Sequence, residues 1–110
     1  MSGRYYVVYI TASSAKEAEK IGAGLLTERL AACVQVSSPI LSMYFWEGEF
    51  CKQTEHQIVA KTTKDLYPLL EAYVKENHSY ELPQIVSVDI ERGLPGYLEW
   101  IDESLKKDTI

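Results

Sequence analysis

The sequence predicts an α+β domain in which helices pack on an antiparallel sheet. Two segments repeat apolar residues at the 3.6-residue period of an amphipathic helix, and a third such segment lies near the C-terminus. Four other segments are rich in β-branched and aromatic residues, as strands are. They follow one another as β-α-β-β-α-β with a terminal helix. Because 110 residues have room for one core, we expect a single domain over residues 1–110.

The first strand and the first helix are predicted from consecutive stretches near the N-terminus. Residues 5–11 are aromatic and β-branched, which is typical of a buried strand. Ser13 and Ser14 are both candidate N-caps of a helix, and Glu17 follows Ser14 at the three-residue spacing of a capping box. The apolar residues that follow lie on one helical stripe: Ala18, Ile21, Gly22, Leu25 and Leu26.

After the first helix the apolar period changes from 3.6 to two, which indicates a strand. Val34 and Val36 lie on one face of it. Residues 37–39 break the alternation, and Pro39 has no amide hydrogen to donate to a neighbouring strand. We therefore expect a bulge or bend there, before residues 40–46 continue as a strand.

A long hairpin is predicted around the middle of the chain. Residues 47–49 (Glu-Gly-Glu) form a turn candidate, because glycine tolerates the positive φ that tight hairpin turns require. Residues 55–62 alternate again and read as the next strand. The two strands on either side of the turn are then antiparallel neighbours.

The second helix is located by its proline. Pro68 fits best in the first helical turn, where no amide donor is needed, so the N-cap is predicted near Asp65. The helix should end at Asn77 or His78. Its apolar stripe consists of Leu66, Leu69, Leu70, Tyr73 and Val74.

The last strand and a terminal helix complete the pattern. Residues 85–90 form the fourth strand, and a third helical stripe contains Leu94, Tyr97, Leu98, Ile101 and Leu105. The order β-α-β-β-α-β is the split β-α-β pattern of ferredoxin-like folds. In that arrangement both helices cover the same face of the sheet.

The opposite face of the sheet also carries apolar side chains. Along residues 40–46, Tyr44 and Trp46 point to one face while Met43 and Phe45 point to the other. A strand that is apolar on both faces is not half-solvated, and the chain has few residues left to cover it. Symmetric association of several copies of the chain is the economical solution.

Composition excludes several classes of protein. The formal net charge of −5 argues against a nucleic-acid-binding protein, which normally has a basic face. No segment is long and apolar enough to span a bilayer, and the N-terminus lacks the apolar region of a signal peptide. We therefore expect a cytoplasmic protein that binds neither nucleic acid nor membrane.

No motif indicates an enzyme. The sequence has no GxSxG, HExxH, GxGxxG or phosphate-binding lysine loop. Cys33 and Cys51 form no CxxC pair and have no evident general base nearby, so we expect reduced, unreactive thiols. The prediction is a protein without catalytic activity.

Four blocks carry a resemblance to a known family. They are Glu28-Arg-Leu-Ala-Ala-Cys33, Tyr44-Phe-Trp-Glu-Gly48, Lys61-Thr-Thr63 and His78-Ser-Tyr-Glu-Leu-Pro83. In this order and spacing they resemble the CutA divalent-cation-tolerance family, from about Tyr6 to Leu105. The resemblance implies a homotrimer with the sheets facing inward and hairpin strands paired across subunits. It also implies a role in tolerance of, or response to, divalent metal ions.

The resemblance further implies a copper site made of a Cys, a Glu and a His. The Glu and His positions correspond to Glu55 and His78, but the Cys position falls on Ile10, which cannot ligate a metal. No cofactor is then required, and binding of Cu(II) or Zn(II) by the two remaining groups is expected to be weak. The alternative is that His78 ends the helix and hydrogen-bonds backbone carbonyls.

Two further positions depart from the family pattern, which commonly has His-Pro-Tyr followed by Pro-Glu. Ser79 replaces a proline, which predicts a less rigid loop after the second helix. Gln84 replaces a glutamate and so removes a carboxylate, which weakens any site for a hard cation.

A ligand cleft at a subunit boundary is the second functional hypothesis. Glu55 and Lys61 lie six residues apart and share a sheet face. With His78 and Tyr80 they could bind a small anionic metabolite, as the PII signalling proteins bind nucleotides between subunits, or they could form an interfacial salt-bridge network. Tyr44 and Trp46 are better interpreted as interface anchors than as ligand-stacking groups. A purely structural trimer that anchors a partner protein is a third possibility.

Overall fold

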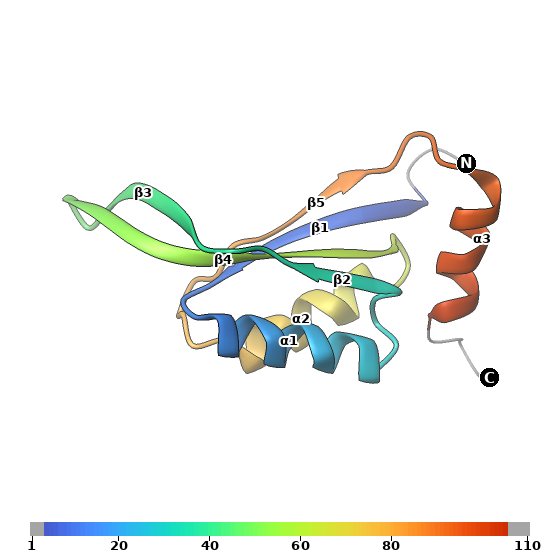
Figure 1. Cartoon of the computed structure of the whole chain (residues 1–110), viewed down its shortest axis with the longest axis horizontal. Helices are drawn as coiled ribbons and strands as arrows, with labels where there is room; N and C mark the ends of the chain where they lie inside the picture. The colour runs from blue at the N-terminus through green and yellow to red at the C-terminus, as the bar shows by residue number, and fades with distance from the viewer. Residues whose placement is uncertain (1–3, 106–110) are drawn as a thin grey trace.

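The computed structural model describes residues 4–105, which form a five-stranded sheet with two helices on one face and a third helix at one end (Figure 1). The elements are β1 (Tyr5–Ala12), α1 (Ala15–Thr27), β2 (Cys33–Val36), β3 (Ile40–Trp46), β4 (Glu49–Thr63), α2 (Tyr67–Asn77), β5 (Ile85–Asp89) and α3 (Pro95–Ser104). This arrangement confirms the predicted α+β class and the antiparallel sheet. No helix within these residues is both long and apolar enough to cross a membrane.

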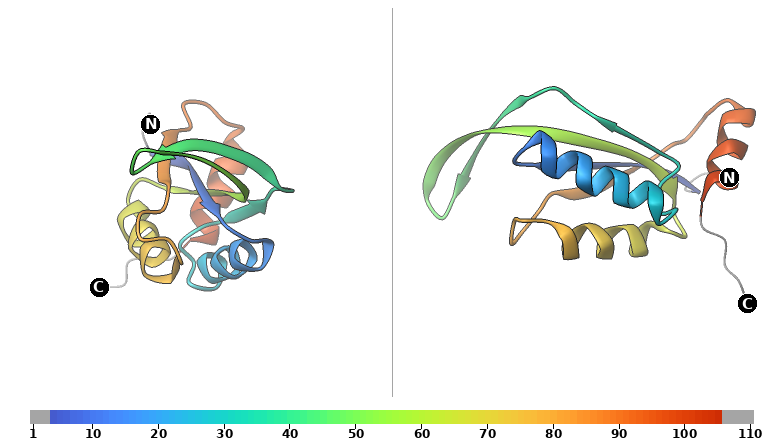
Figure 2. Two further views of the ribbon diagram at one scale, coloured as in Figure 1. Left: turned by 90° about the vertical axis from the view of Figure 1, so that its left-hand side faces the viewer. Right: turned by 60° about the horizontal axis from the view of Figure 1, so that its bottom comes forward.

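Strand β4 organises the sheet because it is 15 residues long. The strand order is β2-β4-β1-β5, and every pairing is antiparallel. The C-terminal half of β4 lies between β1 and β2, whereas its N-terminal half pairs only with β3. The β3–β4 hairpin consequently projects beyond the helices (Figures 1 and 2).

The predicted interruption between β2 and β3 is confirmed as a bulge. Val36 pairs with Ile58 and Ile40 with Glu55, so four steps along one strand oppose three along the other. The amide of Ser37 donates to the Gln57 carbonyl at 2.9 Å, and the Ser37 hydroxyl accepts from the Gln57 amide at 2.8 Å. The serine side chain thus stabilises the point where pairing shifts by one residue.

The hairpin turn has the backbone geometry that its glycine suggests. Glu47 has φ 51° and Gly48 has φ 83°, and two consecutive positive φ values fit the twist of a two-residue hairpin. The prediction that the following strand begins at residue 55 is wrong, because β4 begins at Glu49 directly after the turn. Pairing with β3 keeps residues 49–54 extended although their alternation is weak.

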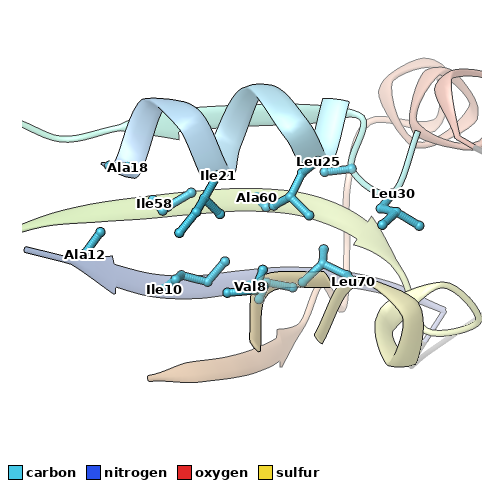
Figure 3. Close-up of a cluster of buried hydrophobic side chains, with 12 residues drawn as sticks. Val8, Ile10, Ala12, Ala18, Ile21, Leu25, Leu30, Ile58, Ala60 and Leu70 are labelled. Atoms are coloured by element: carbon cyan, nitrogen blue, oxygen red, sulfur yellow. The ribbon is translucent and has the colours of Figure 1, made fainter. Parts of the chain in front are cut away.

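The main core lies between the sheet and the two helices (Figure 3). Helix α1 begins as predicted, since Ser14 Oγ accepts a hydrogen bond from the amide of Glu17 at 3.1 Å. Its buried residues face the sheet residues Val8, Ile10, Ile58 and Ala60. They are Ala18, Ile21, Gly22 and Leu25. Leu26 of the predicted stripe is exposed instead.

Helix α2 begins within one residue of its predicted start but differs from its predicted stripe. The N-cap is Leu66 rather than Asp65, and no side chain caps the helix. The first turn is closed by the backbone, with the Leu70 amide donating to the Leu66 carbonyl at 3.0 Å. Leu70 and Val74 are buried, whereas Leu69 is 51% exposed. The helix ends at Asn77 with His78 as its C-cap, within the predicted range.

Helix α3 packs on the end of the sheet rather than on its face (Figure 2). Ile101 and Leu105 form a second small core with Tyr5 and Ala32. Asp102 fixes the helix to β1, because it accepts hydrogen bonds from Arg4 Nη2 at 2.8 Å and from the Tyr5 hydroxyl at 2.5 Å.

The sheet face opposite α1 and α2 is not covered by any element within residues 4–105. By alternation, Ile58 and Ala60 face the helices, so the odd-numbered residues of β4 face away from them. Large apolar side chains are exposed on this face and on the projecting hairpin. They include Leu41, Met43, Tyr44, Phe45, Trp46, Phe50, Val86 and Val88.

Candidate functional site

A cleft of about 690 Å³ lies where the β3–β4 hairpin meets the segment that follows α2. Its volume is in the range of small-molecule sites. The lining comes from β1 (Thr11), from both hairpin strands and from residues 80–84. It includes the aromatic side chains of Tyr44, Trp46 and Tyr80 and the carboxylates of Glu55 and Glu81.

A chain of hydrogen bonds runs through the cleft. The Tyr44 hydroxyl donates to Gln53 Oε1 at 2.6 Å, Gln53 Nε2 donates to the Tyr80 hydroxyl at 2.9 Å, and that hydroxyl donates to Glu55 Oε2 at 2.7 Å. Burial, together with the hydrogen bond and the negative charge of Glu55, raises the pKa of Tyr80 far above its usual range. Tyr80 therefore remains a hydrogen-bond donor to the carboxylate.

His78 is held by two hydrogen bonds and its side chain is fully buried. Its Nε2 lies 2.7 Å from the carbonyl oxygen of Thr11, and its Nδ1 lies 3.0 Å from the amide nitrogen of Tyr80. This pairing fits the neutral imidazole, in which Nε2–H donates and Nδ1 accepts. Neither ring nitrogen then has a lone pair available for a metal ion.

The residues that the sequence suggested for metal binding do not form a site in this arrangement. Tyr80 lies between the two proposed ligands, since its amide bonds His78 and its hydroxyl bonds Glu55. No three His, Cys, Asp or Glu side chains among residues 4–105 are close enough together to hold a metal ion. The donor set therefore does not fit a resident metal. The geometry of His78 is that of a residue that hydrogen-bonds the backbone rather than that of a metal ligand.

Lys61 does not join the cleft. Its Nζ donates to Gln35 Oε1 at 3.2 Å, and the residue pairs with Val7 and Cys33 near the other end of β4. Six residues of extended strand separate it from Glu55 by roughly 20 Å. The structure thus brings together Glu55, Tyr80, Tyr44 and Trp46, places His78 directly behind Tyr80, and leaves Lys61 outside.

Glu17 is a structural residue of this region that sequence reasoning treated only as part of a helix cap. Its Oε2 accepts from the Ser79 amide at 2.8 Å and its Oε1 from the Ser79 hydroxyl at 3.0 Å. Ser79 was expected to free the loop, but these two bonds fix it. Burial raises the pKa of Glu17, yet the hydrogen bonds that its carboxylate accepts from Ser79 and Ser13 outweigh burial and lower the pKa overall.

The variant Glu17→Gln should lose about 1–2 kcal/mol of stability at neutral pH, because a charged acceptor of two hydrogen bonds becomes neutral. A lowered folded-state pKa stabilises the fold above the unfolded value, near 4.5, and this contribution is lost as pH falls through the folded pKa. The difference between wild type and variant should therefore shrink below about pH 4.5. Urea unfolding of wild type and variant at pH 7 and at pH 3 measures the stability difference at each pH. A difference independent of pH would contradict a stabilising role for the charged Glu17 carboxylate.

Gln53 is the residue of the cleft that the sequence did not indicate. It links two tyrosines, Tyr44 and Tyr80, that lie 36 positions apart in the chain. Nothing in the residues around Gln53 in the sequence indicates such a role. The role depends on the register of β3 against β4, which places Gln53 opposite Ser42 and so within reach of the Tyr44 hydroxyl.

Comparison with known proteins identifies the family. The profile of the CutA1 divalent ion tolerance protein family matches residues 6–104. A divalent-cation tolerance protein CutA from Archaeoglobus fulgidus is 43% identical over 99 residues, which are 90% of this chain and 96% of that protein. A chloroplastic CutA 1 protein from rice is 34% identical over 92% of this chain and 57% of its own length.

The fold agrees with the same assignment. The solved structure of a periplasmic divalent cation tolerance protein CutA from Archaeoglobus fulgidus superposes with a TM-score of 0.90 at 42% identity. The match covers 93% of this chain and 99% of that one. The profile, the sequence identity and the fold agree over almost the whole length, and the chain belongs to the CutA1 divalent ion tolerance family.

Proposed function

We propose that this protein acts in tolerance of, or response to, divalent metal ions, as a homotrimer without catalytic activity. The observation that carries the proposal is the family match over residues 6–104, because relatives with 43% and 34% identity carry that role or the CutA name. A cytoplasmic location is part of the proposal. The relatives named chloroplastic and periplasmic show that family membership alone does not fix the compartment.

The uncovered sheet face supports the trimeric part of the proposal. Apolar side chains on both faces of the β3–β4 hairpin are exposed in the single chain, among them Phe45 at 74% and Trp46 at 47%. Exposed apolar surface of this extent is typical of an interaction site. In a closed symmetric assembly every hairpin is covered by a neighbouring copy, and no copy is left with an open face.

Of the properties that the family name suggests, metal binding has the least support in this chain. Any Cu(II) or Zn(II) ion at His78 must displace the hydrogen bond to Thr11 or the one to Tyr80. Cys33 and Cys51 are free thiols on different parts of the sheet. We expect affinities weaker than about micromolar, as for a site with two separated ligands. Tolerance then works without a tightly bound ion.

An anionic ligand receives no support from the cleft. Its lining contains Glu55 and Glu81 but neither lysine nor arginine, and Lys61 is bound to Gln35 elsewhere. The PII-like alternative would need cationic side chains from another copy of the chain. The folded chain therefore supports a PII-like ligand less than the sequence does.

A complementation experiment tests the proposed role. In a bacterial host from which its own CutA1-family gene is deleted, expression of this chain should restore growth in copper, zinc and cobalt series to the parental level. Cellular metal content measured in the same cultures separates exclusion from regulation. Growth equal to that of cells with an empty vector, at matched expression, would refute the role.

A further inference from the structure

One charged side chain lies among the described strand residues in the four-stranded part of the uncovered sheet face. Cross-strand partners point to the same side of a sheet, and Lys61 is paired with Val7 on one side and with Cys33 on the other. The strand residues around this row on the same face are apolar or neutral. They are Tyr9, Gln35, Val59, Val86 and Val88. Lys61 is therefore an isolated cation in a largely apolar surface.

No carboxylate within the described part of the chain neutralises this cation. The ion pairs found there lie elsewhere, at Asp102 and at Glu17, so no acidic side chain among those residues is within 4.0 Å of Lys61 Nζ. The ammonium group donates instead to the neutral Gln35 Oε1 at 3.2 Å. Because this bond occupies the amide oxygen of Gln35, the two hydrogen atoms on its amide nitrogen remain free to donate to another group.

Assembly would bring several copies of Lys61 together. This step rests on the homotrimer proposed above, in which the uncovered faces pack against one another around a threefold axis. Lys61 lies on β4, a middle strand in the order β2-β4-β1-β5, and packed sheets lie about 10 Å apart, so its side chains meet near the axis. Three ammonium groups there would repel one another and lose contact with water, which is unfavourable without a negative partner.

We propose that the trimer binds one inorganic oxyanion of the phosphate type on its threefold axis, between three Lys61 side chains, with the Gln35 amides as further donors. A tetrahedral anion with one bond along the axis presents three equivalent oxygens, one to each copy, and hydrogen bonds from ammonium groups to such oxygens are strong. The site is separate from the cleft, whose lining contains neither Lys61 nor Gln35. It is incomplete in the single chain, because each copy supplies one third of it.

Equilibrium dialysis of the full-length protein against radiolabelled inorganic phosphate tests the site, because a position on the axis fixes the stoichiometry. With ionic strength held constant by sodium gluconate, we expect one phosphate bound for every three chains. The dissociation constant should be about millimolar or tighter. Sedimentation equilibrium of the same samples gives the number of associated chains, so that the ratio of phosphate to oligomer is known.

Two lysine variants separate the proposed site from general positive charge. Lys61→Gln can still donate to Gln35 but has no charge, and it should weaken phosphate binding about tenfold or more. Lys75→Gln is the matched control, since it removes one exposed lysine on α2, and it should leave the affinity within about twofold.

Thermal dissociation of the trimer distinguishes an anion site from an ion pair between copies. Phosphate should raise the dissociation midpoint of wild type and leave that of Lys61→Gln unchanged, because a ligand stabilises only the state that binds it. Without phosphate, Lys61→Gln should dissociate at the same temperature as wild type or higher, since the repulsion between ammonium groups is removed. If Lys61 instead pairs with a carboxylate of a neighbouring copy, the variant dissociates at a lower temperature and phosphate has no effect on wild type, which would overturn the proposal.

Failure of the anion site and failure of the trimer give different results. A wild-type trimer that binds no phosphate up to about 100 mM, or that binds one phosphate per chain, overturns the anion site and leaves the trimer intact. Unchanged affinity in Lys61→Gln does the same. A monomeric wild type overturns both. If Lys61→Gln loses the native circular dichroism spectrum, the stoichiometry measured on wild type decides alone.

Discussion

Leu41→Asp combined with Phe45→Asp should convert the protein from trimers into folded monomers. Leu41 is 57% and Phe45 74% exposed, and both lie on the hairpin face that Met43 shares. Phe45 also contacts Phe50 across the hairpin, with ring centroids 5.6 Å apart. In a trimer these side chains would be buried, and two carboxylates in each copy would then be desolvated without partners.

The expected loss is about 4 kcal/mol or more of association free energy, which is roughly a thousandfold in the dissociation constant. The free energy of unfolding of the monomer should change little, because neither side chain belongs to a core cluster. Sedimentation equilibrium at micromolar concentration gives the number of chains, and circular dichroism verifies the fold.

Leu69→Asp is the matched control for that double variant. Leu69 is 51% exposed but lies on the outer surface of α2, away from the hairpin. The Leu69→Asp variant should therefore remain a trimer. If the hairpin variant also sediments as three chains, the hairpin is not the interface; if wild type is monomeric, the trimer is wrong altogether.

The order of the elements could be predicted because local signals agree with the final packing. Ser14 with Glu17, the glycine after Glu47 and the proline at position 39 each act on the backbone within a few residues. The errors have a different origin. The start of β4 and the exposure of Leu69 depend on what a neighbouring strand or the sheet covers, which no local pattern records.

The site was predicted in part for a related reason. Alternation places Glu55 and Lys61 on one sheet face, and this holds, but alternation carries no information about distance along a strand. The long β4 keeps them apart. Tyr80 reaches Glu55 only because the segment after α2 turns back over the hairpin, and that turn is set by the bonds of His78 and Ser79.

His78→Ala should therefore act on stability rather than on a metal site, and strongly. The variant leaves the Thr11 carbonyl and the Tyr80 amide without partners and opens a cavity where a fully buried ring stood. Unpaired buried groups and a cavity together cost about 3 kcal/mol or more. His56→Ala is the matched control, because His56 is partly exposed and makes one bond, to the Ser37 carbonyl at 3.0 Å.

Unfolding in the presence and absence of a chelator distinguishes a structural role of His78 from a role as a metal ligand. Guanidinium unfolding is compared at one protein concentration, since an oligomer gains stability with concentration. If His78 is a structural residue, the difference between wild type and His78→Ala is the same with and without EDTA, and His78→Gln, whose amide can still donate to Thr11, regains part of the loss. If His78 is a ligand, EDTA brings wild type down to the level of the variant, and added Cu(II) or Zn(II) restores only wild type. That second outcome would require the imidazole to break its hydrogen bond to Thr11 or to Tyr80 when it binds metal. His78 would then be a metal ligand, with Glu55 as the candidate second ligand.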